Sequence, residues 1–171
     1  METEAGDVDD IKWLDDIEMR AWRVLLTATS RLNAVLDHEL QADSGIPLSE
    51  YEVLVGLSEA PDRRLRMSEL ADFLHLSPSG LTRRLDRLVR AGLVVRERCP
   101  SDRRGSYAVL TNAGFERLVE AAPGHLRGVR HHFIDRFAPA ELVELSEMLE
   151  RVIETDAEAE TPQPVELRRG A

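Results

Sequence analysis

The chain has 171 residues, a formal net charge of −10, and 43% hydrophobic against 32% charged residues. This composition is typical of one soluble globular domain, and no stretch approaches the roughly 18 consecutive apolar residues of a membrane span. The first ten residues hold five acids and no apolar run, unlike a signal peptide, and the single Cys99 excludes an intramolecular disulfide or an all-cysteine zinc site. We therefore expect a cytoplasmic protein with no membrane partner.

Charge is distributed unevenly along the chain. Residues 1–60 carry a net charge of −10, residues 61–110 one of +5, and residues 111–171 one of −5. Lys12 is the only lysine, and the other 21 of the 22 basic residues are arginines, whose planar donor fork suits bidentate contacts to phosphate and guanine. The basic middle segment is therefore compatible with a nucleic-acid partner despite the acidic total.

The N-terminal region predicts two helices. Between residues 14 and 40, apolar side chains recur at steps of three and four, which indicates a long amphipathic helix ended by the glycine and proline of residues 45–47. Ser49 and Glu52 form a capping-box pattern, which predicts a second helix running to about Leu57. The long apolar stripe of the first helix calls for a partner that covers it.

Residues 67–91 predict two shorter helices joined by a tight turn. Ser68 is the expected N-cap of the first of them. Ser77 caps the second, Pro78 occupies its first position, and Gly92 supplies the left-handed residue that ends it. This spacing is that of a helix-turn-helix motif.

A β-hairpin follows the motif. Residues 93–98 alternate as a strand does, residues 99–105 favour a turn, and residues 106–110 have the composition of a return strand. A hairpin directly behind a helix-turn-helix is a wing. The predicted fold class is therefore mainly α-helical with a small β-hairpin wing.

Two more helices complete the chain. Thr111 is the expected cap of a helix that runs to about Phe137, kinked or split by the proline and glycine at residues 123–124. A last helix begins at Pro139 with an apolar stripe of its own. The polar composition from residue 157 onward predicts a flexible tail.

The second helix of the motif combines an apolar stripe with a polar face. Short hydroxyl side chains near its N-terminus allow close approach to a DNA groove, and the arginines further on can reach guanine edges or phosphates. The candidate DNA-binding residues on this face are Ser79, Thr82, Arg83 and Arg87. Taken alone, the pattern also fits an ordinary amphipathic helix with a solvated arginine face.

The wing turn adds a second basic group. Asp102, Arg103 and Arg104 follow one another there, where an arginine can enter the narrow minor groove and a carboxylate can hold a guanidinium in place. A merely solvated turn is not expected at this distance behind a helix-turn-helix. These three residues therefore join the candidate DNA-binding set.

Several segments together resemble the MarR family of winged-helix transcriptional regulators. They are LHLSPSGLTR at residues 74–83, LVRAGLV at 88–94, DRRG at 102–105 and LTNAG at 110–114. Their order and spacing extend the resemblance over roughly residues 14–153. It implies a winged helix-turn-helix flanked by N- and C-terminal dimerisation helices, and a homodimer that presents two recognition helices to a pseudo-palindromic double-stranded DNA site, with small ligands tuning the affinity.

The resemblance also assigns roles and boundaries. The family's Asp-x-Arg wing motif falls on Asp102 and Arg104, which makes Arg104 the minor-groove residue and Asp102 its orienter. The family's recognition-helix contacts fall on the four candidates named above. The implied organisation is a flexible acidic N-terminus (1–10), a single domain (11–156) with dimerisation helices (11–45 and 111–156) around a DNA-binding lobe (46–110), and a flexible tail (157–171).

An aromatic residue, the cysteine and the histidines can each be interpreted either as functional or as ordinary structural residues. Trp22 is a candidate for lining the site of a small aromatic or anionic effector, although aromatic residues on helices are more often core. Cys99 lies among arginines that favour a thiolate, which suggests redox sensing. His38 with His125 or His131 suggests metal sensing, but no ligand spacing is diagnostic, so we expect no metal.

The sequence as a whole predicts a sequence-specific DNA-binding transcriptional regulator, a ligand-responsive repressor acting as a homodimer on a pseudo-palindromic operator. No nucleophile elbow, P-loop, dinucleotide glycine motif or His-Glu metal motif occurs, so we expect neither an enzyme nor a cofactor. The alternatives are a metal- or redox-responsive regulator of the same fold, and a winged-helix protein-interaction module that does not bind DNA.

Overall fold

The computed structural model describes residues 11–99 and 105–154. Its helices are α1 (Asp16–Ser44), α2 (Leu48–Glu59), α3 (Met67–Phe73), α4 (Pro78–Arg90), α5 (Asn112–His132) and α6 (Pro139–Glu154). Its strands are β1 (Arg64–Arg66), β2 (Val94–Arg98) and β3 (Ser106–Leu110). Short 3-10 helices cover Pro61–Arg63 and Ile134–Arg136. This order confirms the predicted winged helix-turn-helix with long helices on either side.

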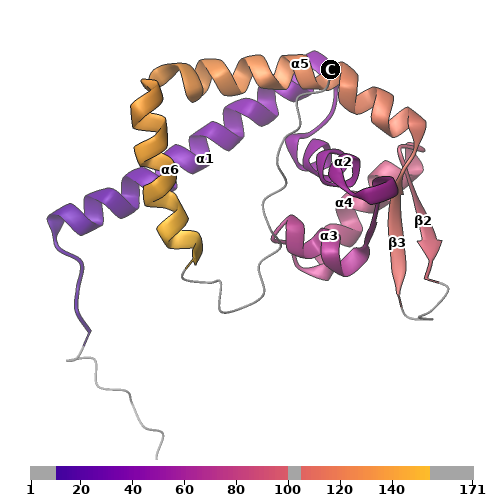
Figure 1. Ribbon diagram of the computed structural model, residues 1–171, viewed down its shortest axis with the longest axis horizontal. Helices are drawn as coiled ribbons and strands as arrows, with labels where there is room; N and C mark the ends of the chain where they lie inside the picture. The colour runs from indigo at the N-terminus through magenta and orange to yellow at the C-terminus, as the bar shows by residue number, and fades with distance from the viewer. Residues whose placement is uncertain (1–10, 100–104, 155–171) are drawn as a thin grey trace, which may run out of the picture.

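Figure 1 shows the elements in two groups. The C-terminal part of α5 lies along α1, and α6 turns away from the end of α5. At the other end of the molecule, α2, α3, α4 and the sheet gather close to the N-terminal part of α5. None of the helices in the described ranges is long and apolar enough to cross a membrane.

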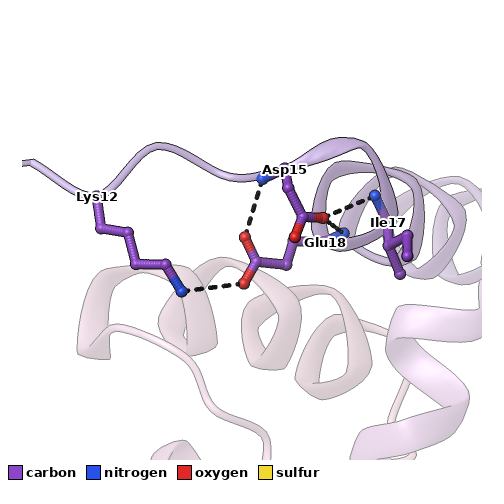
Figure 2. A network of polar contacts seen from close by, with 4 residues as sticks. All are labelled: Lys12, Asp15, Ile17 and Glu18. Atoms are coloured by element: carbon purple, nitrogen blue, oxygen red, sulfur yellow. Dashed lines mark hydrogen bonds and ion pairs between the residues drawn. The ribbon is translucent and has the colours of Figure 1, made fainter.

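The first helix begins at a complete capping box. Oδ1 of Asp15 accepts hydrogen bonds from the N–H groups of Ile17 and Glu18, both at 2.8 Å, and Glu18 accepts one from the N–H of Asp15 at 2.9 Å (Figure 2). Lys12 adds an exposed ion pair to Glu18 at 3.4 Å (Figure 2). Gly45 ends the helix with a φ of 69°, in the left-handed conformation, at the break predicted for residues 45–47.

The predicted capping box of α2 is wrong. The helix begins at Leu48 with Pro47 as its N-cap, so that Ser49 already lies inside the first turn. The N–H of Leu48 donates to Oδ1 of Asp37, a residue of α1, at 2.8 Å. The cap is therefore supplied by a neighbouring helix, which no local sequence pattern can indicate.

The predicted start of α3 is also wrong, because an unpredicted strand runs directly into it. The N-cap is Arg66, the last residue of β1, and its N–H donates to Oε2 of Glu69 at 2.8 Å. Ser68 lies within the helix. β1 is too short and too basic to show the alternation of a typical strand.

The turn and the boundaries of α4 are as predicted. Oγ of Ser77 accepts the N–H of Gly80 at 3.2 Å, Pro78 is the first helical residue, and Gly92 follows the C-cap with a φ of 73°. His75 in the turn has a φ of 50°, which is uncommon outside glycine and allows the chain to reverse between α3 and α4.

The three strands form one antiparallel sheet in the order β1-β3-β2. In β3, Val109 pairs with Arg64 of β1 on one side and with Val95 of β2 on the other. The hairpin of β2 and β3 confirms the predicted wing, and β1 ties the wing to the start of α3.

The core lies between α2, α3, α4 and the sheet. On α4, Leu81, Leu85 and Leu88 have no exposed surface, which confirms the predicted apolar stripe. Within the described ranges, the other apolar residues with no exposed surface are Val53, Leu54, Leu57, Leu70, Val94 and Ala108. Burying apolar side chains from several elements together fixes the rotation of α4 about its own axis.

The expected break at residues 123–124 does not split α5. The helix runs from Asn112 through Pro123 to His132, and it ends before Phe137, the predicted end. An internal proline costs one backbone hydrogen bond, so continuity here requires support from packing.

That support comes from close contact with α1. A Cβ on Gly124 would lie 3.1 Å from Oδ2 of Asp43, and one on Gly128 would lie 2.8 Å from Oε2 of Glu39. Nε2 of His132 lies 2.7 Å from Oε1 of the same Glu39, at hydrogen-bond distance. The glycines let the two helices approach closely, and this contact supports α5 as one continuous helix.

Gly114 at the start of α5 provides a test of the packing between the helix and the wing. A Cβ there would lie 2.1 Å from the carbonyl oxygen of Leu93 and 2.7 Å from Cδ1 of Leu110. We expect Gly114→Ala to lower the free energy of unfolding by about 1–3 kcal/mol, measured by urea denaturation followed by circular dichroism. The exposed neighbour Ala113→Ser is the control, and equal midpoints for the two variants would contradict the prediction.

Candidate nucleic-acid interface

The polar face of α4 is open to solvent. Because the leucine stripe is buried, the opposite side of the helix points outward. The exposed residues on it are Ser79, Thr82, Arg83, Arg87 and Arg90. The structure therefore brings the four helix residues of the candidate set onto one exposed face.

The hydroxyl groups lie at the N-terminal end of this face. Oγ of Ser79 lies 3.2 Å from Oγ of Ser77, and Oγ1 of Thr82 donates to the carbonyl of Pro78 at 2.8 Å. Both contacts are local to the helix and leave acceptor lone pairs on the hydroxyl oxygens. Small side chains here allow the helix backbone to come close to a ligand.

The arginines of α4 differ in their surroundings. Arg87 forms an ion pair with Glu50 of α2, whose side chain is only 14% exposed, and Arg84 forms one with Glu52 of α2 at 3.3 Å. Arg83 has no hydrogen-bond or ion-pair partner within residues 11–99 and 105–154. Arg83 can therefore engage an anion without giving up an existing ion pair, whereas Arg87 must leave Glu50.

Arg96, which no sequence pattern singles out, connects the wing to α4. Its Nη2 lies 2.9 Å from Oδ1 of Asp86 and donates to the carbonyl of Thr82 at 3.4 Å. This residue of β2 therefore anchors the wing against α4. The sequence shows only that Arg96 lies in a basic segment. It cannot indicate the contacts of Arg96, because its partners lie in another element.

A second arginine cluster surrounds Tyr107 on the sheet. The guanidinium carbon of Arg64 lies 3.9 Å from the centre of the ring, and Arg64 also pairs with Glu97 at 3.4 Å. Nη2 of Arg66 donates to Sγ of Cys99 at 3.7 Å, and Sγ lies 3.9 Å from Oη of Tyr107. Cys99 is buried, and the suggestion that it senses redox state stays a prediction.

Three of the seven candidate DNA-binding residues, Asp102, Arg103 and Arg104, lie outside the described residues. The structure describes the strands on either side of them, β2 and β3, and the roles of the three residues stay predictions.

A cavity of about 450 Å³ lies between α1, α2, α5 and the turn of the helix-turn-helix. Its lining residues are Asn33, Leu36, Leu48, Tyr51, Glu52, Val55, Phe73, Leu74, His75 and His125. Burial raises the pKa of Tyr51 and lowers that of His125, so that both side chains are uncharged near neutral pH. Trp22, the candidate effector residue, is 51% exposed and is not among the lining residues.

The histidines suggested for metal sensing do not form a ligand set. Among the described residues there is no group of three or more His, Cys, Asp or Glu side chains placed to hold a metal ion. His125 lies beside Tyr51 with ring centres 4.6 Å apart, and His131 packs against His132 with ring centres 4.7 Å apart.

Comparison with known proteins places this architecture in one family. The sequence profile of the MarR family matches residues 44–105. AbsC, a MarR family transcriptional regulator from Streptomyces coelicolor, is 43% identical with a TM-score of 0.79, and the match covers 85% of this chain and 97% of AbsC. Sco3205, a MarR family regulator of the same organism solved in complex with DNA, is 42% identical with a TM-score of 0.81, covering 86% and 92%.

Among curated proteins, the HTH-type transcriptional repressor YetL of Bacillus subtilis is 29% identical over 131 residues, which are 75% of this chain and 78% of YetL. The similar proteins thus share both the fold and a described role in transcription. The chain belongs to the MarR family of transcriptional regulators.

Proposed function

We propose that this regulator binds double-stranded DNA by inserting α4 into the major groove. The observation that carries the proposal is the exposed face of Ser79, Thr82 and Arg83, which the buried leucine stripe holds in a fixed direction. Short hydroxyl residues followed by an arginine suit close approach and contacts to bases or phosphates. The DNA complex of the similar Sco3205 supports the same use of the fold here.

The remaining candidate residues have supporting roles in this proposal. Arg87 exchanges Glu50 for a phosphate, Arg104 enters the adjacent minor groove, Asp102 orients Arg104, and Arg103 contacts the backbone. Arg96 holds the wing against α4, so that the helix and the wing reach neighbouring grooves with a fixed separation.

We further propose that the protein acts as a homodimer. Large apolar side chains lie exposed along the first half of α1 and along α6, for example Ile17 at 80% and Val152 at 62%. A monomer would leave these apolar faces in water, and a second copy would cover them by two-fold symmetry. Trp22 lies on the α1 part of this surface.

The regulator is proposed to be a repressor that a small molecule releases from its operator. The repressor YetL supports the sign of regulation, and the cavity supports the response to a ligand. The cavity touches the α1 and α5 layer on one side and residues of the helix-turn-helix on the other. Occupancy there can change how α4 is presented to DNA.

Replacing Arg83 tests the recognition face. We expect Arg83→Ala to weaken operator binding by about 1–3 kcal/mol and to lower the slope of log affinity against log salt by roughly one unit for each phosphate interaction that the substitution removes. The measurement is fluorescence anisotropy at several salt concentrations, with DNA from upstream of the coding region and unrelated DNA as competitor. Arg127→Ala on the outside of α5 is the matched control. If Arg83→Ala binds the DNA as tightly as the native protein does, Arg83 is not a DNA contact and the recognition face fails its test. If the native protein itself does not bind the DNA, a protein-interaction role replaces DNA binding.

Replacing Arg104 tests the wing separately. We expect Arg104→Ala to weaken DNA binding and to reduce the salt slope by roughly one unit per subunit, because an arginine is removed from the minor groove. The thermal unfolding midpoint should not change, and calorimetry on the free protein checks this. Unchanged DNA affinity would remove the wing from the mechanism.

Charging the apolar stripe of α6 tests the dimer. We expect the double variant Leu149→Glu with Val152→Glu to reduce the native mass from that of two chains to that of one, because burying carboxylates without partners is costly. Multi-angle light scattering measures the mass. Glu147→Lys is the control, a change of charge on the opposite side of α6. A double variant that keeps the mass of two chains would show that α6 does not form the interface.

A further inference from the structure

The outer half of the wing has little apolar packing to hold it. Within β2, Val94 is the buried residue, and the other four residues of the strand are exposed. Within β3, Ala108 is the buried residue nearest the turn, and Tyr107 beyond it is partly buried. A two-stranded hairpin on its own is only marginally stable in water. Other contacts must therefore set the direction of the hairpin beyond Ala108.

Tyr107 lies where the three strands of the sheet meet at this outer end. It is paired with Arg66 of β1 on one side and with Glu97 of β2 on the other. Arg66 is also the N-cap of α3, where its N–H donates to Oε2 of Glu69. A side chain at position 107 can therefore connect the hairpin to the first helix of the helix-turn-helix.

Two guanidinium groups lie against the ring of Tyr107. Cζ of Arg64 is 3.9 Å from the ring centre, and Cζ of Arg66 is 5.6 Å from it. Both lie within the roughly 6 Å over which an aromatic ring attracts a cation. Nη2 of Arg64 also lies 3.4 Å from Oε2 of Glu97. The ring is thus held by two side chains of β1, one of which reaches across to β2.

The hydroxyl group of Tyr107 extends this cluster toward the turn. Sγ of Cys99 lies 3.9 Å from Oη of Tyr107 and accepts a hydrogen bond from Nη2 of Arg66 at 3.7 Å. The N–H of Cys99 donates to the carbonyl of Gly105 at 3.0 Å, which joins the two strands next to the turn. The cluster therefore extends from the N-cap of α3 to the outer end of the described hairpin.

We propose that Tyr107 is a positioning residue for DNA binding. Its ring, held by Arg64 and Arg66, fixes the angle at which the hairpin of β2 and β3 stands against the helix-turn-helix. Arg96 restrains the same hairpin against α4, so the wing is held at two separate points. The proposal rests on the proposed function in requiring that the wing contacts DNA, and it assigns no DNA contact to Tyr107 itself.

Replacing the tyrosine tests the role of its ring. We expect Tyr107→Ala to weaken operator binding by about fivefold or more, because both guanidinium groups lose the ring that orients them. Tyr107→Phe keeps the ring and should recover most of the lost affinity. Ser106→Ala, next to it on β3, is the matched control. Fluorescence anisotropy measures the affinity, and equal losses in Tyr107→Phe and Tyr107→Ala would overturn the proposal.

A double-mutant cycle separates positioning of the wing from a general loss of stability. In an Arg104→Ala background, where the wing contact is already removed, Tyr107→Ala should weaken binding by about twofold or less. In an Arg83→Ala background, which leaves the wing intact, it should weaken binding by the same factor as in the native protein. Equal losses in the two backgrounds would show that Tyr107 acts on the whole fold, and the proposal would be wrong.

A second variant keeps the test valid if Tyr107→Ala does not fold, which circular dichroism checks. Arg64→Gln removes one guanidinium group from the ring and leaves the backbone pairing of β1 in place. Arg63→Gln is its control, because it removes the same charge from the ring of Phe115 instead. We expect the larger loss of affinity with Arg64→Gln, and we expect the difference to disappear in the Arg104→Ala background. Equal losses for the two variants contradict the proposal.

The outcomes also separate this proposal from the proposed function. If Arg104→Ala weakens binding and Tyr107→Ala does not, the wing contacts DNA without being positioned by Tyr107, and only this proposal fails. If Arg104→Ala has no effect on DNA affinity, the wing has no part in DNA binding, and its proposed role fails together with this proposal. The test of α4 through Arg83→Ala is independent of both results.

Discussion

The burial of one leucine stripe determines how this protein presents its functional face. Leu81, Leu85 and Leu88 are fully buried against the neighbouring helices and the sheet, so α4 cannot rotate without exposing them. Rotation would cost roughly 1.5–3 kcal/mol for each leucine brought into water. The direction of Ser79, Thr82 and Arg83 follows from this constraint on the opposite face.

Ion pairs from two sides refine that orientation. Glu50 and Glu52 on α2 hold Arg87 and Arg84, while Arg96 from the wing holds Asp86. Ion pairs of this exposure contribute little to stability, so their role is geometric. They leave one arginine of α4 available to an anion, whereas another must first give up its carboxylate partner. Through Glu52, which also lines the cavity, they connect the cavity wall directly to α4.

The winged helix and the long helices differ in the charge and polarity of their surfaces. The basic residues of the middle segment gather on the winged helix, whereas the acidic flanking segments form the long helices with exposed apolar stripes. Acidic residues away from the side proposed to face DNA avoid contact with phosphate while keeping the net charge negative. The surfaces proposed for DNA binding, subunit association and ligand binding thus have separate locations in one small domain.

The sequence by itself determined the helix-turn-helix, the wing, the stop signals at Gly45 and Gly92, and the outward residues of α4, because these follow from local periodicity and backbone preferences. Only the tertiary structure decided the caps of α2 and α3, the continuity of α5 through Pro123, the strand β1 and the pairing of Arg96 with Asp86. In most of these cases the deciding partner lies in another element, as Asp37 does for Leu48 and Asp43 for Gly124. Contacts between residues distant in sequence leave no local pattern, so they appear only when the chain is folded.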